Sequence, residues 1–184
     1  MTDASSVDDR DYGRVERGEG RLHLRFTRRF PQRPESVWRA LTEPEHLAAW
    51  FPQDIEGERA AGARLRFVSR EDAAQAFDGE MLAFEPPLLM EMRWGTDVLR
   101  FELRPDGSGT VLEFTDTFDE IGKGARDGAG WHACLDLLTY AVAAEPAPWS
   151  SADRFGLVHP GYVQRLGAEL STIGPPDRSE HAQN

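Results

Sequence analysis

The sequence has very little of several residue types that mark particular classes of protein. Its 184 residues include a single cysteine, Cys134, so the chain cannot form an intramolecular disulfide and suits a reducing compartment. No apolar run approaches the roughly 18 residues that span a bilayer. The first ten residues include three aspartates and lack the apolar segment of a secretory signal. We therefore expect a cytoplasmic protein that does not insert into a membrane.

Basic charge is scarce and dispersed. Lys123 is the only lysine, and 21 basic against 32 acidic residues give a formal net charge of −11. Such a charge repels phosphate backbones, and no cluster of basic residues with interleaved aromatics offsets that repulsion. The composition thus argues against nucleic acid as a partner, whereas a basic protein surface stays open.

The common motifs of catalysis and metal binding are also missing. The chain has no Gly-Xaa-Ser-Xaa-Gly elbow, no glycine-rich phosphate loop and no His-Glu-Xaa-Xaa-His. Its five histidines are scattered without the spacing of a ligand set. We predict no catalytic residue from a motif, no metal site and no cofactor.

What the sequence does contain is an alternation of apolar and polar residues in several short runs. Residues 22–30 alternate in this way. Five further strand-like runs lie between residues 64 and 118, and turn signals that contain Pro or Gly divide several of them. Pro34 and Pro44 each begin a short helical pattern after the first strand. From Trp131 to Val142 the apolar period becomes that of an amphipathic helix. The order is one strand, two short helices, about six strands and a long helix.

This order predicts an α+β domain with a curved antiparallel sheet. Short connections between consecutive strands require antiparallel pairing, and one helix covers so many strands only if the sheet curls around it. We expect a flexible N-terminal segment (1–20), one domain (21–146), a C-terminal extension that packs on that domain (147–174), including a helix near Tyr162–Leu170, and a flexible tail (175–184).

Several local motifs resemble those of one known superfamily. They are the run from Arg29-Phe30-Pro31 to Leu41-Thr42, the run from Pro44 to Phe51, Gly79-Glu80-Met81-Leu82, and Gly130-Trp131. Together they resemble the SRPBCC (START-like, helix-grip) superfamily, and within it the branch of the activator of Hsp90 ATPase C-terminal domain. The resemblance implies a helix-grip fold, a hydrophobic ligand cavity between sheet and helix, and no obligatory cofactor.

The candidate ligand-binding residues are bulky apolar side chains together with one carboxylate. Aromatic and methionine side chains around a helix-gripped sheet either fill a core or line a pocket, and periodicity does not separate the two. The cavity-lining candidates are Trp38, Trp50, Phe51, Phe67, Met81, Met92, Trp94, Phe101, Phe114, Asp116, Trp131, Leu135 and Leu138.

Four polar or reactive residues each allow two interpretations. Asp116 shares strand parity with Phe114 and Phe118, which would turn it inward, but a solvated carboxylate near a strand end is favoured. The parity of Arg93 favours the outer face over a contact with a ligand carboxylate. His132 falls outside the helix's apolar stripe and is expected at solvent or the sheet edge rather than as a general base. Cys134 is expected to be a small buried hydrophobe rather than a nucleophile.

Three functions follow from this reading. The first is the binding of a small hydrophobic molecule, lipid- or polyketide-like, in the cavity. The second is a chaperone-related interaction protein of the Hsp90-activator type, and the third is a cyclase or aromatase that uses the same cavity. The chain is expected to be a monomer or a homodimer.

Overall fold

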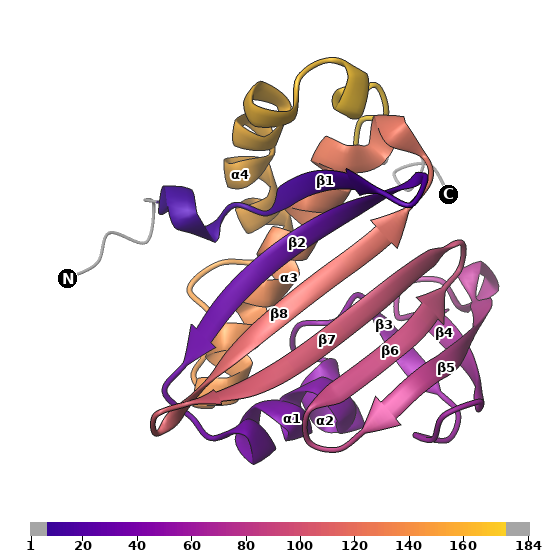
Figure 1. Ribbon diagram of the computed structural model, residues 1–184, viewed down its shortest axis with the longest axis vertical. Helices are drawn as coiled ribbons and strands as arrows, with labels where there is room; N and C mark the ends of the chain where they lie inside the picture. The colour runs from indigo at the N-terminus through magenta and orange to yellow at the C-terminus, as the bar shows by residue number, and fades with distance from the viewer. Residues whose placement is uncertain (1–6, 176–184) are drawn as a thin grey trace.

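The computed structural model describes residues 7–175 of the chain, which form an eight-stranded sheet and two longer helices (Figure 1). Every strand pairs antiparallel with its neighbours, in the order β1-β2-β8-β7-β6-β5-β4-β3. The strands are β1 (Arg14–Gly18), β2 (Arg21–Phe30), β3 (Gln53–Glu56), β4 (Arg64–Ser69), β5 (Phe77–Glu85), β6 (Leu89–Trp94), β7 (Asp97–Asp106) and β8 (Gly109–Phe118).

Two short helices and two long ones accompany the sheet. The α-helices are α1 (Pro34–Thr42), α2 (Pro44–Leu47), α3 (Gly124–Ala143) and α4 (Ser151–Leu166), and the 3-10 turns are η1 (Asp9–Asp11), η2 (Ala73–Gln75), η3 (Ile121–Lys123) and η4 (Glu169–Ser171). Prolines occupy the first turn of α1 and of α2, where the missing N–H is not needed. The predicted α+β helix-grip architecture is confirmed.

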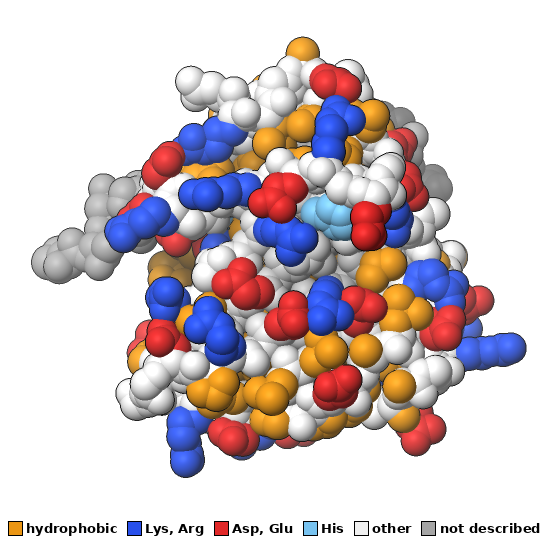
Figure 2. Space-filling view, in the orientation of Figure 1, with side chains coloured by type: hydrophobic (Ala, Val, Ile, Leu, Met, Phe, Trp, Pro, Cys, Tyr) orange, Lys and Arg blue, Asp and Glu red, His pale blue; other side chains and the backbone are white. Residues whose placement is uncertain are grey.

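The sheet curves around α3, and α1 and α2 lie at one end of the concave side (Figure 1). Inward-facing residues of β2, β7 and β8 pack against α3, with Phe101, Phe114 and Leu135 fully buried. The outer face carries acidic and basic side chains together (Figure 2). Several of them pair across strands, as Arg100 does with Glu91 at 2.9 Å. One apolar face and one charged face explain the period-two alternation of the strands.

Two segments differ from the expectations. Residues 14–18 form an edge strand, although the sequence predicted a flexible segment to residue 20. The last long helix begins at Ser151 rather than near Tyr162, because Ser150 and Asp153 form a capping box and Pro160 is accommodated within the helix. Helix α4 packs against α3. Residues 1–6 and 176–184, including most of the predicted tail, lie outside the described residues.

Within residues 7–175 no helix combines the length and the apolar character that a membrane crossing requires.

Candidate functional site

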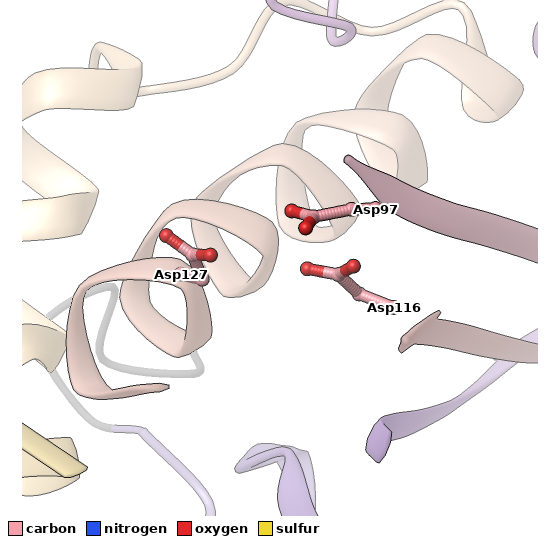
Figure 3. Close-up of side chains that lie close together, drawn as sticks. All are labelled: Asp97, Asp116 and Asp127. Atoms are coloured by element: carbon pink, nitrogen blue, oxygen red, sulfur yellow. The ribbon is translucent and has the colours of Figure 1, made fainter. Parts of the chain in front are cut away.

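Three carboxylates from different elements meet beneath the first turns of α3. Asp97 begins β7, Asp116 lies in β8 and Asp127 lies in α3, and one carboxylate oxygen of each is within 4.8 Å of the others (Figure 3). The sheet register brings the first two together, because Asp116 pairs with Leu99, which shares the face of Asp97. All three side chains point toward a common centre (Figure 3).

Lys123 supplies the cation of this cluster. Its ammonium pairs with Asp97, and it lies 3.2 Å from Asp127 Oδ2. Burial lowers the pKa of Lys123, but Asp127 and Asp97 outweigh that effect and the net direction is upward. The only lysine of the chain is therefore charged in the interior and holds two of the three carboxylates. Three acidic oxygens at this spacing are of the kind that hard cations bind, but here the Lys123 ammonium already lies against them.

Asp116 is the third carboxylate, and it lies in a different environment from the other two. Its side chain is fully buried, and within residues 7–175 its Oδ1 has no hydrogen-bond partner. Its Oδ2 accepts a hydrogen bond of 2.9 Å from the Trp131 indole Nε1. Burial, followed by the charges of Asp97 and Asp127, raises the pKa of Asp116 well above its usual value. Asp116 thus favours the protonated form, and the expectation of a solvated carboxylate is wrong because η3 and α3 cover the end of β8.

A pocket of about 260 Å³ borders this cluster. It lies between α3, the start of α4 and the end of β6. Its lining residues are Pro52, Trp94, Arg126, Asp127, Gly130, Trp131, Cys134, Ser151 and Phe155. The rings of Trp94 and Trp131 meet edge to face with centroids 5.4 Å apart. Trp131 therefore forms a wall of the pocket with its ring and bonds to Asp116 through its Nε1.

The predicted lining residues divide into two groups. Trp94 and Trp131 line the pocket, and Asp116 lies directly behind Trp131. The others lie in the core between the sheet and the helices, namely Trp38, Trp50, Phe51, Phe67, Met81, Met92, Phe101, Phe114, Leu135 and Leu138. Several of the aromatic rings in this group contact one another or Trp131, for example Phe101 with Phe114 at 4.8 Å and Phe114 with Trp131 at 5.0 Å between centroids.

His132 is buried, which corrects the expectation that it faces solvent or the sheet edge. Its Nδ1 is 3.0 Å from the Tyr162 hydroxyl, and its Nε2 is 3.3 Å from Asp136 Oδ2. The Tyr162 oxygen also accepts the Gly13 N–H at 2.8 Å. Burial lowers the pKa of His132, so the ring favours the neutral form, in which its Nδ1 accepts from the Tyr162 hydroxyl. Its Nε2 faces Asp136 but makes no hydrogen bond within residues 7–175. The covering helix α4, which supplies Tyr162, was predicted only in its last part, so the burial of His132 was missed.

The other two residues lie as expected. Arg93 is on the outer face of the sheet, paired with Glu80. Cys134 is a buried free thiol, and burial raises its pKa to about 12. Cys134 also touches the pocket, but such a thiol is almost entirely protonated at neutral pH.

Sequence reasoning missed five charged or aromatic members of this region, Asp97, Lys123, Arg126, Asp127 and Phe155. Phe155 belongs to the part of α4 that was not predicted, and the Ser150–Asp153 capping pattern is the signal that could have revealed it. Lys123 entered the sequence analysis only as the single lysine of the chain, and no role in a site was predicted for it. No periodicity marks Arg126 or Asp127, and the carboxylates that lie near Asp127 come from β7 and β8.

A curved antiparallel sheet that grips a long helix, with a pocket beside that helix, defines the START-like, helix-grip class of α+β proteins. The family model described as "Activator of Hsp90 ATPase homolog 1-like protein" matches residues 32–143. The chain belongs to this family, which confirms the resemblance drawn from the motifs.

Solved structures share the fold at low sequence identity. A conserved protein of unknown function from Enterococcus faecalis is 19% identical with a TM-score of 0.68, over 84% of this chain and 90% of that one. CalU16 from Micromonospora echinospora is 19% identical with a TM-score of 0.63, over 83% and 94%. DynU16, from the dynemicin biosynthetic locus, is 24% identical with a TM-score of 0.57, over 67% of this chain and 48% of that one. No curated protein sequence matches the chain significantly.

Proposed function

We propose that the chain binds a small hydrophobic molecule in the pocket between α3, α4 and the end of β6. The observation that carries this proposal is that aromatic side chains line a space that no side chain fills. Trp94, Trp131 and Phe155 surround the space, and Gly130, which also borders it, has no atom within 4 Å of a Cβ built on its backbone. Apolar walls with a few polar groups are typical of ligand pockets.

The size of the pocket favours a compact ligand. Its volume of about 260 Å³ lies just below the roughly 300–1,000 Å³ of common ligand pockets. Burial of apolar ligand surface would supply affinity at about 25 cal/mol per Å². DynU16, which shares the fold, is described as a protein of a biosynthetic locus. That description is the reason why we favour a biosynthetic product, lipid- or polyketide-like, over other apolar molecules.

The interaction-protein alternative finds less support. The outer face of the sheet is covered by charged residues that already pair with one another, such as Arg93 with Glu80 and Arg100 with Glu91. A partner docking there would have to compete with these pairs. For a cyclase-type enzyme, Asp116 is a fully buried acid near the pocket, but it lies behind Trp131, and the two oxygens of Asp127 already face Arg126 and Lys123. Conversion of a bound ligand during the test below would favour the enzyme.

The test is native mass spectrometry of the freshly purified chain, compared with the same sample after denaturation. The variant Gly130→Leu fills the pocket, and Gly156→Leu is its matched control because Gly156 lies on α4, exposed and equally without neighbours. We expect a mass excess that disappears on denaturation in the wild type and in Gly156→Leu, but not in Gly130→Leu.

Two results would contradict the proposal. An equal mass excess in Gly130→Leu would place the ligand elsewhere. No excess in any sample, together with no thermal stabilisation by a panel of apolar compounds, would remove the ligand altogether. Capture of a defined partner by such a ligand-free protein would then favour the interaction protein.

A further inference from the structure

Two of the lining residues of the pocket carry charge, Arg126 and Asp127. They differ in what they offer to a ligand. Asp127 Oδ1 accepts a hydrogen bond of 2.9 Å from Arg126 Nε. Asp127 Oδ2 is buried from solvent and lies 3.2 Å from the Lys123 ammonium. Both oxygens of Asp127 are therefore directed to residues of the chain itself.

Arg126 is used by its neighbours only in part. Its Nε binds Asp127, whereas its two terminal Nη groups make no hydrogen bond to any residue in the described range 7–175. The side chain is 30% exposed at the pocket. A guanidinium presents its five N–H donors in a rigid fork that matches a carboxylate, and an Nε already bonded to Asp127 fixes the orientation of that fork. Four donors on the Nη groups remain for a ligand.

The charges around Arg126 balance, so an anion at its Nη groups would not face an excess of negative charge. Lys123 lies between Asp97 and Asp127, and Asp116 favours the neutral, protonated form because burial raises its pKa. Two negative charges then face two positive ones, and the charge nearest the open space is the guanidinium. Ser151, at the start of α4, adds a hydroxyl to the same pocket.

We propose that the ligand is an amphipathic anion, with a compact apolar body between Trp94, Trp131 and Phe155 and one carboxylate-like group bound by the Nη groups of Arg126. This inference rests on the proposed function and specifies its ligand class. The net charge of −11 repels anions at long range, but that field is screened over about 10 Å in 0.1 M salt. The short contact with Arg126 then decides the binding.

The test uses three probes that share one apolar body, octanoate, 1-octanol and octylammonium, titrated calorimetrically into the full chain. The variant Arg126→Gln removes the guanidinium. Arg104→Gln is the matched control, because Arg104 is an exposed arginine near the other end of β7 from Asp97. We expect octanoate to bind about tenfold more tightly than octanol to the wild type and to Arg104→Gln, as befits one charge-assisted contact. In Arg126→Gln the two affinities should become equal, with that of octanol unchanged.

The other outcomes show whether the inference fails alone or together with the proposed function. Equal binding of octanoate and octanol to the wild type, abolished by Gly130→Leu, would overturn the anionic ligand and leave the apolar pocket intact. Tighter binding of octylammonium would assign the recognition to Asp127 and overturn the inference. Absence of binding by all three probes would count against the inference and the proposed function together.

Discussion

The indole Nε1 of Trp131 donates a hydrogen bond of 2.9 Å to Oδ2 of the buried Asp116. This single contact joins the two notable features of the molecule, since the Trp131 ring is a wall of the pocket and Asp116 belongs to the carboxylate cluster. A ligand that displaces the ring would therefore also change the surroundings of a buried proton.

Replacing Asp116 by asparagine should remove a pH dependence of stability. Because the pKa of Asp116 is raised in the folded chain, the folded state keeps a proton that the unfolded state releases above about pH 4. Wild-type stability should then fall relative to Asp116→Asn as the pH rises from 4 toward the raised pKa, with a limiting slope of about 1.4 kcal/mol per pH unit. Urea denaturation between pH 4 and pH 8 measures the difference, and parallel curves for the two proteins would contradict it.

Removing the ammonium of Lys123 should be strongly destabilising. The Lys123 and Asp97 side chains are 7% and 4% exposed, so Lys123→Met leaves buried carboxylates without their cation. Breaking a buried pair in this way costs about 3–5 kcal/mol. The double variant Lys123→Met/Asp97→Asn should recover a large part of the loss, because Asp127 keeps Arg126. Chemical denaturation of the three proteins tests this, and an additive double variant would argue against the pair.

Two glycines of α3 should respond in opposite directions to alanine. A Cβ on Gly128 would lie 2.6 Å from the Tyr162 ring, whereas a Cβ on Gly130 meets nothing within 4 Å. Gly128→Ala should destabilise the contact of α3 with α4 by about 1–3 kcal/mol. Gly130→Ala should stabilise the helix by up to about 1 kcal/mol. Thermal and urea unfolding of both variants give the comparison, and equal effects would mean that the close approach of α4 is absent in solution.

Removing the Tyr162 hydroxyl should cost more than removing another tyrosine hydroxyl of the same region. Tyr162→Phe leaves the Gly13 N–H and the His132 Nδ1 without their partner. A buried polar group left without a hydrogen bond lowers the free energy of unfolding by about 1–3 kcal/mol. Tyr140→Phe is the control, since the Tyr140 ring meets Trp149 edge to face and its hydroxyl bonds to nothing within residues 7–175. Similar unfolding free energies for both variants would contradict the role of the network.

The strands and the long helix could be predicted because their signals are local. Residues 22–30 alternate between a buried and a charged face, and proline or glycine ends most of the runs. The period of the Trp131–Val142 stripe is equally plain. Edge strand β1 was missed because none of its residues is buried, so its sequence carries no apolar alternation. Helix α4 escaped because Pro160 reads as a break.

The site was harder to predict than the fold. Asp116 had the inward parity, but whether a strand end is wet depends on what covers it, and the cover comes from η3 and α3. The same holds for His132, which α4 buries. Strand parity places aromatic residues such as Phe101 and Phe114 on the inner face of the sheet, where the structure has them. Parity does not show whether these rings leave a cavity between them or pack against one another.

By itself the sequence determined the α+β architecture and the family, because alternation, helical period and proline positions act between residues close in the chain. Only the tertiary structure decided that Asp97, Asp116 and Asp127 share one site with Lys123, and that Trp131 lies between Asp116 and the pocket. Those contacts join residues far apart in sequence. Their energies depend on burial and on distance in space, which no local pattern of residues records.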